Sequence, residues 1–244
     1  MKRGFTLAEV LITLGIIGVV AALVMPNLIQ KQNERATVAR VKKIYSVISN
    51  ATALWQAENG CETNISDCLT QYSGLDCRNG FSGIEKHLNV VEKRYQNQSI
   101  ANTYWLPETS RGLDGQTADR AWYGVNRVAL DSGLICNYML NDGTTMMVSL
   151  PEDWKNNGFM LFDINGSKKP NRVGVDVFPL GFGTYDESIK GVHPHFAEDG
   201  GTQPGGLCNI NKSDCNPDDG KSPTAYVLAH DKLPDLVKMG YPKN

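Results

Sequence analysis

The feature that most constrains this chain is an apolar run near its N-terminus. Residues 5–25 form a stretch of 21 residues that contains one charged side chain, Glu9. As an α-helix rising about 1.5 Å per residue, this stretch reaches about 30 Å, which matches the hydrocarbon core of a bilayer. The run therefore predicts a membrane-spanning helix.

The flanks of the run indicate its orientation and its fate. Lys2 and Arg3 precede it, so the tip is expected to stay cytoplasmic and the remainder to face outward. A secretory signal has a shorter apolar region followed by a small-x-small cleavage site. Here the run is longer and ends in Val24, Met25 and Pro26. An uncleaved single-span anchor is the plain alternative.

Glu9 does not fit a plain anchor. A carboxylate inside a bilayer costs about 2.5–3.5 kcal/mol and marks a candidate functional residue. It requires a cationic partner, and the apolar run contains none. Cleavage after Gly4 would create a new α-amino group on Phe5, four residues before Glu9. The terminus of a neighbouring subunit could then neutralise the carboxylate.

Residues 4–12 resemble the processing motif of type IV pilins and type II secretion pseudopilins. Gly4 matches the residue before the cut, Phe5 the residue that becomes the N-methylated terminus, and Glu9 the acid at the fifth mature position. Pro26 also lies where such proteins often carry a proline. The resemblance is confined to the start of the chain, about the first 30 residues.

The resemblance implies an α+β fold in which a long N-terminal helix packs on an antiparallel β-sheet head. It also implies cleavage and methylation by prepilin peptidase, residence in the bacterial inner membrane with the head outside, and polymerisation into a pilus or pseudopilus. The implied partners are prepilin peptidase, other pilin or pseudopilin subunits, an inner-membrane assembly platform and membrane lipid. No enzymatic activity is implied, and we find no nucleophile, phosphate-binding or zinc-protease motif.

The helix is expected to continue beyond the membrane. Residues 27–58 contain no Gly or Pro, and Gly60 is a plausible stop. Apolar residues recur at steps of three and four, which marks one helical face: Val38, Val41, Ile44, Ile48, Ala51 and Trp55. Pro26 is expected to kink or locally melt the helix. We therefore divide the chain into a leader (1–4), a transmembrane and polymerisation helix (5–25), an amphipathic helix (26–59) and a globular head (60–244).

A basic cluster lies just beyond the apolar run, at Lys31, Arg35, Arg40, Lys42 and Lys43. Lipid headgroups, the acidic heads of neighbouring subunits and plain solvation are all open explanations. Residues 59–244 carry 17 Lys/Arg against 23 Asp/Glu, so the head is acidic. Bulk nucleic-acid binding is therefore not expected.

The head is expected to form antiparallel strands. Residues 134–140 and 144–150 alternate around Asn141-Asp142-Gly143, which predicts a hairpin. Further strands are expected at 158–164 and 175–180. Residues 84–95 are expected to form a short helix, and residues 225–241 a strand followed by a helix or turn. No long helical pattern separates the strands, which favours an antiparallel sheet.

All six cysteines follow residue 60, which favours disulfides in an oxidising compartment. They are Cys61, Cys68, Cys77, Cys136, Cys208 and Cys215. The spacings fit no common zinc pattern, although structural metal and free thiols stay open as alternatives. We predict that Cys208 pairs with Cys215, and that the other four pair among themselves in one of three ways. The preferred arrangement joins Cys61 to Cys68 and Cys77 to Cys136.

Asp163, Asn165 and Asp176 belong to the most patterned stretch of the head and offer the oxygens that Ca²⁺ requires. The spacing is not that of an EF-hand. Asp and Asn also shape turns by bonding their own backbone. A structural loop and a bound cation are therefore both open.

The rival to the pilin hypothesis as a whole is a single-span anchored extracytoplasmic binding domain that never polymerises.

Overall fold

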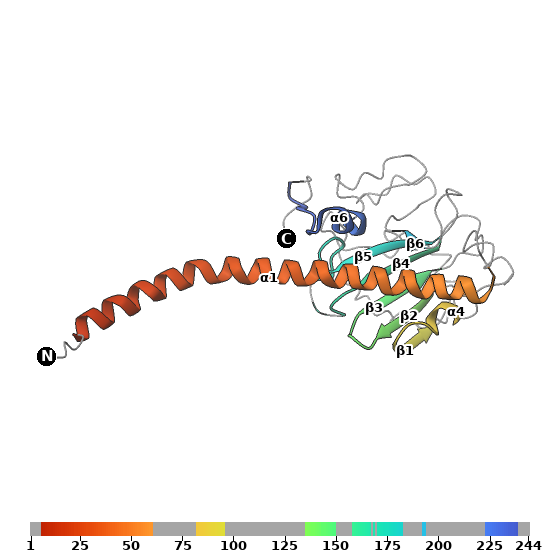
Figure 1. The fold of residues 1–244 in the computed structure, drawn as a ribbon, viewed down its shortest axis with the longest axis horizontal. Helices are drawn as coiled ribbons and strands as arrows, with labels where there is room; N and C mark the ends of the chain where they lie inside the picture. The colour runs from red at the N-terminus through yellow and green to blue at the C-terminus, as the bar shows by residue number, and fades with distance from the viewer. Residues whose placement is uncertain are drawn as a thin grey trace.

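The computed structural model describes residues 6–60, 82–95, 135–149, 158–166, 168, 170–182, 192–193 and 223–238. These residues form a long helix, α1 (Leu7–Glu58), and a six-stranded sheet. One half of α1 lies across the sheet and the other half extends away from it (Figure 1). The α+β fold expected from the sequence is confirmed.

Helix α1 is 52 residues long and contains Pro26 without interruption. The helix curves through its N-terminal half (Figure 1), where Pro26 cannot donate the hydrogen bond that a helical residue normally makes. At the other end, the side-chain amide of Asn59 donates to the Trp55 carbonyl oxygen at 2.8 Å. Gly60 follows with φ at 67°, a conformation that favours glycine and ends the helix.

The sheet is a meander, because each strand pairs antiparallel with the next one in the chain. Its strands are β1 (Val90–Tyr95), β2 (Ile135–Leu140), β3 (Thr145–Ser149), β4 (Gly158–Asp163), β5 (Val177–Phe182) and β6 (Val192–His193). The predicted hairpin is β2–β3, closed by a turn in which Gly143 has φ at 83°. The backbone carbonyl oxygen of Thr144 accepts a hydrogen bond from the Leu140 N–H across this turn at 2.9 Å.

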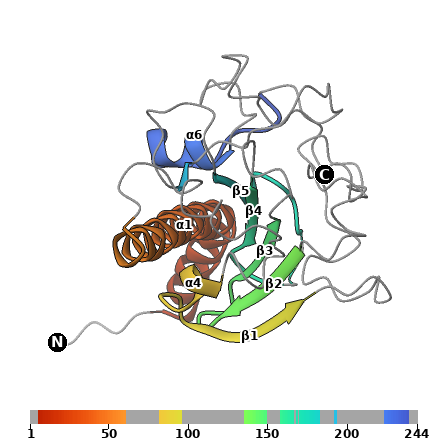
Figure 2. The same cartoon turned by 90° about the vertical axis from the view of Figure 1, so that its right-hand side faces the viewer.

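Alternate residues of four strands form the core under α1. Tyr138 faces Met146, Met146 faces Phe162, and Phe162 faces Phe178 in register across β2 to β5. The rings of Phe162 and Phe178 stack with centroids 5.9 Å apart. Figure 2, which looks along the helix, shows α1 on one face of this sheet. The helix buries seven residues there: Val38, Val41, Ile44, Ile48, Ala51, Thr52 and Trp55.

Helix α4 (Ser82–Glu85) covers the end of this stripe. Gly83 lies against the Trp55 indole so closely that a Cβ at this position would overlap the ring. The tryptophan therefore fixes where the chain returns to the sheet, and only glycine fits at that contact.

Two expectations about the head were wrong. Residues 84–95 do not form one helix, because α4 ends at Glu85 and residues 90–95 are strand β1. The backbone of this segment pairs with β2, and its valines and tyrosine suit a strand. Residues 225–230 are not a strand but part of helix α6 (Pro223–His230). Pro223 at its first position is pre-organised for a helix start.

Helix α6 is attached to both main elements. The Thr224 hydroxyl donates to the Pro179 carbonyl oxygen of β5 at 2.5 Å, and Val227 is fully buried. The helix also contacts α1 directly. It therefore links β5 to the long helix.

We predict that Ile48→Ala lowers the free energy of unfolding of the head by about 2–5 kcal/mol, because Ile48 is fully buried between α1 and the sheet. The measurement is denaturant unfolding of the full-length protein in detergent, followed by near-UV circular dichroism. The matched control is Leu54→Ala on the same helix, which is 54% exposed and should change stability by about 0.5 kcal/mol or less. Equal losses in the two variants would contradict the packing described here.

Candidate functional site

The N-terminal half of α1 presents apolar side chains on all sides. From Leu7 to Ile29, fourteen large apolar residues are exposed: Leu7, Val10, Leu11, Ile12, Leu14, Ile16, Ile17, Val19, Val20, Leu23, Val24, Met25, Leu28 and Ile29. Within α1, an 18-residue window reaches a mean hydropathy of 2.5 and none of it is buried, so the helix is long and apolar enough to cross a membrane. Such a surface is stable only in lipid or against other apolar surfaces.

Glu9 begins this surface as part of a capping box. The Thr6 hydroxyl accepts from the Glu9 N–H at 3.3 Å, and the Glu9 carboxylate accepts from the Thr6 N–H at 2.8 Å. The Thr6 hydroxyl also lies 2.8 Å from the same carboxylate oxygen, Oε2. The box satisfies backbone donors that a helix start leaves without partners. It also holds the Glu9 side chain against the first turn of the helix.

The capping box leaves the negative charge of Glu9 without a counter-ion among the residues that the structure describes. Its Oε1 atom accepts no hydrogen bond from those residues. Gly4 and Phe5, the predicted cleavage pair, lie outside the described part of the chain. The geometry therefore shows how Glu9 is held, and leaves its predicted pairing with an α-amino group to experiment.

The second half of α1 is tied to the head by charged contacts as well as by its apolar stripe. Lys42 forms an ion pair with Asp231 after α6, and Lys43 forms one with Asp142 of the β2–β3 turn at 2.7 Å. Two members of the basic cluster therefore pair with their own head. The sequence did not suggest this, because the partners lie 189 and 99 residues away.

Asp163, Asn165 and Asp176 are brought together by a loop between β4 and β5. Both carboxyl groups are buried, with Asp163 at 0% and Asp176 at 3% exposure. Asp176 accepts from the backbone N–H groups of Asn171 and Arg172 and from the Asn165 amide, at 2.6–3.1 Å. Asp163 accepts from the Asn165 N–H at 3.0 Å. The loop is therefore organised around two buried acids.

Asn171 occupies the middle of this loop, with φ at 49°. With its amide nitrogen directed inward, it donates to Asp163 Oδ2 at 3.0 Å and to the carbonyl oxygens of Lys168 and Gly166 at 2.9 and 3.2 Å. One amide thus joins three oxygens that would otherwise face each other. These bonds support the turn interpretation, and Ca²⁺ at Asp163, Asn165 and Asp176 stays a prediction.

Burial, helped by the negative charge of Asp176, raises the pKa of Asp163 to about 8, although hydrogen bonds from the backbone N–H groups of Asn165 and Gly166 act to lower it. Burial likewise raises the pKa of Asp176. Asp163 is thus predominantly protonated at neutral pH in the folded chain. The bound proton makes the buried carboxyl group neutral and so avoids the free-energy cost of burying a negative charge.

Cys136 takes part in a disulfide. The other five cysteines lie outside the described residues, so the pairing scheme stays a prediction.

A family model for the prokaryotic N-terminal methylation motif matches residues 1–25. The chain carries the prepilin-type cleavage and methylation motif of type IV pilins and pseudopilins. No curated protein and no solved structure matches the chain. The match covers the segment in which the sequence placed Gly4, Phe5 and Glu9, and it does not reach the head.

We predict that the stability of the head falls as the pH rises from about 5 to 8, with Asp163 as a main cause. The unfolded pKa of Asp is about 3.9, so between that value and the folded value of about 8 the folded state holds the extra proton. As the pH rises through this window, release of that proton becomes more favourable, which stabilises the unfolded chain relative to the folded one. The measurement is the melting temperature of the full-length protein across this range, and Asp163→Asn should flatten the slope.

Asp235→Asn is the control, because Asp235 is an exposed carboxylate and its replacement should leave the slope unchanged. The same melts with added Ca²⁺ or with chelator should coincide, since the oxygens already accept hydrogen bonds. A Ca²⁺-dependent rise in the wild type that Asp163→Asn abolishes would instead establish the cation site.

Proposed function

We propose that this chain is a prepilin that matures into a structural subunit of a type IV pilus or a type II secretion pseudopilus. The methylation motif supports a pilin-like or pseudopilin precursor, and thereby processing by prepilin peptidase and association with other subunits. In this proposal cleavage falls between Gly4 and Phe5, and Phe5 is N-methylated. The chain then rests in the inner membrane with its head outside, until the assembly platform extracts it into a filament.

The observation that carries the proposal is the division of α1 into two halves. The half that follows residue 37 is locked onto the sheet by seven buried residues. The half before Pro26 extends beyond the head and exposes apolar side chains all round. A helix of this kind can exchange lipid for the corresponding helices of other subunits without any change in the head. In the filament these helices would form the core and the heads the outer surface.

Glu9 has a function in this proposal that a plain anchor does not explain. The capping box satisfies Oε2 through Thr6 and leaves a charge that is costly in lipid. A cationic α-amino group on Phe5 of a neighbouring subunit offsets that cost in the filament. Each subunit supplies one such acid and one such amine, so the pairing also sets the axial register.

The rival is an anchored extracytoplasmic domain that is neither processed nor polymerised. The N-terminus of the mature protein discriminates between them. N-methylated Phe5 in the mass spectrum supports the prepilin, and an intact Met1 supports the anchor.

We predict that Gly4→Val blocks maturation, because the peptidase is expected to accept only a minimal side chain before the cut. The variant should accumulate in the membrane as a precursor that retains the four leader residues, as read by mass spectrometry. Gly15→Val is the matched control, since no atom outside the helix's own neighbouring turns lies within 4 Å of a Cβ there. Normal maturation of Gly4→Val would overturn the assigned cleavage site.

We further predict that Glu9→Leu and Glu9→Gln both insert in the membrane and both fail to polymerise. Leucine removes the carboxylate and the cap, whereas glutamine can keep the capping box and loses only the charge. The measurement is the ratio of subunit in the sheared filament fraction to subunit in the membrane. Glu34→Gln, a charge neutralisation beyond the apolar run, is the control and should polymerise. Filaments from Glu9→Gln at wild-type levels would show that charge pairing is not required.

A further inference from the structure

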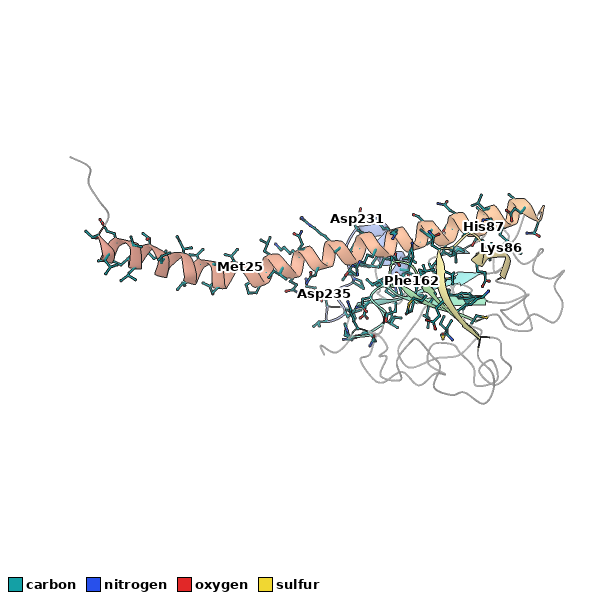
Figure 3. All side chains as sticks on the ribbon, turned by 90° about the horizontal axis from the view of Figure 1, so that it is seen from below. Met25, Lys86, His87, Phe162, Asp231 and Asp235 are labelled. Carbon is teal, nitrogen blue, oxygen red and sulfur yellow. The ribbon has the colours of Figure 1, made fainter. Side chains whose placement is uncertain are left out.

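The segment that follows α6 runs down the long helix toward its membrane end. Asp231, with φ at 57°, turns the chain and pairs with Lys42. Two residues later, the Leu233 N–H donates to Glu34 at 3.3 Å. Glu34 precedes Lys42 by eight residues, which is about 12 Å along a helix axis. Figure 3 shows Asp235 on the side of Asp231 that faces Met25.

This descent brings the C-terminal turn, residues 234–238, close to the level of lipid headgroups. The exposed apolar side chains of the N-terminal half end at Ile29, five residues before Glu34. Five residues correspond to about 7–8 Å of helix. The polar layer on each side of a hydrocarbon core is about 5–8 Å thick. With the exposed apolar side chains from Leu7 to Ile29 in the hydrocarbon core, the turn therefore lies at or just above the membrane surface.

The chemistry of this region differs from that of the rest of the head. Val237 is 52% exposed, and the Lys238 side chain is 84% exposed. Residues 27–42 and 223–238 together carry six Lys/Arg and three Asp/Glu, whereas residues 59–244 as a whole are acidic. Lys31 and Arg35 of α1 are exposed on the same stretch of helix. Exposed basic side chains and an exposed valine thus lie at the end of the head that is nearest the apolar half of α1 (Figure 3).

We propose that the C-terminal turn docks on anionic lipid headgroups while the subunit rests in the membrane. Val237 would contact the headgroup boundary, and Lys238, Lys232, Lys31 and Arg35 would neutralise lipid phosphates. This surface holds the head in one orientation above the bilayer. The inference depends on the membrane-anchored state of the proposed function and does not require polymerisation.

The ion pair between Lys238 and Asp235 does not prevent this docking. The two groups are 3.2 Å apart on an exposed turn, and such exposed pairs contribute little to stability. A basic side chain also gains free energy near an anionic membrane, so anionic lipid can compete with Asp235 for Lys238. The carboxylates of Asp231 and Glu34 repel anionic lipid less than unpaired carboxylates would. Asp231 is paired with Lys42, and Glu34 accepts a hydrogen bond from the Leu233 N–H.

The test places a tryptophan in the turn and a quencher at the headgroups. Full-length Val237→Trp is reconstituted singly into nanodiscs that carry a headgroup nitroxide lipid, in either phosphatidylcholine or a phosphatidylglycerol mixture. We expect the added fluorescence to be quenched, and more strongly in phosphatidylglycerol. Leu54→Trp is the matched control, since Leu54 is 54% exposed and lies twenty residues beyond Glu34, about 30 Å further along α1. It should not be quenched in either lipid.

The charge requirement is tested by adding Lys238→Glu to Val237→Trp. The extra quenching in phosphatidylglycerol should be lost. Lys86→Glu, an equal change at an exposed lysine near the far end of α1 (Figure 3), should leave the extra quenching intact. Equal quenching in the two lipids, or extra quenching in phosphatidylglycerol that survives Lys238→Glu, would overturn the proposal.

A separate measurement distinguishes this failure from failure of the proposed function. Resistance of the protein to carbonate extraction reports whether α1 spans the bilayer. Protein that is extracted would refute the membrane anchor itself. Protein that resists extraction and shows no quenching at Val237→Trp would refute only the docking of the turn.

Discussion

The packing of one stripe of α1 on the sheet is the contact on which the rest of the structure depends. Ile44, Ile48 and Trp55 are almost completely buried there, together with the aromatic ladder that includes Phe162 and Phe178. Because this stripe fixes the second half of the helix, the first half has no part of the described head to pack against. One continuous helix therefore serves two environments. The head obtains a long core element, and the apolar half stays available to lipid or to other subunits.

Much of this architecture could be predicted, because its signals are local. The apolar run, Glu9 and the three-and-four spacing from Val38 to Trp55 are periodicities that need no tertiary information. The β2–β3 hairpin was predictable from alternation around an Asn-Asp-Gly turn. The predicted secondary structure was wrong for two segments, residues 84–95 and 225–230. Both are short apolar runs whose spacing suits both a helix and a strand. Their states are decided by the pairing of residues 90–95 with β2 and by the contact of α6 with β5 and α1.

The charged contacts were beyond prediction for a different reason. Lys42 and Lys43 looked like members of one basic cluster, yet each pairs with an acid from a distant part of the head. In the Asp163 loop the sequence identified the acids that come together but did not identify Asn171, whose amide joins their oxygens. An asparagine that follows a proline reads as an ordinary turn residue. Only the three-dimensional arrangement shows that it lies between buried acceptors.

The meander has a consequence for the order in which the molecule folds. Each strand pairs with its neighbour in the chain, so sheet formation requires mostly local contacts, which favours fast folding. The contacts of the C-terminal segment are the opposite case, because Asp231 and Leu233 reach back across 189 and 199 residues to α1. These residues also belong to the last described segment of the chain, residues 223–238, which is synthesised after all six strands. The contact between this segment and α1 can therefore form only after the strands have been synthesised, and a chain truncated before Asp231 would lose this contact while keeping the strands.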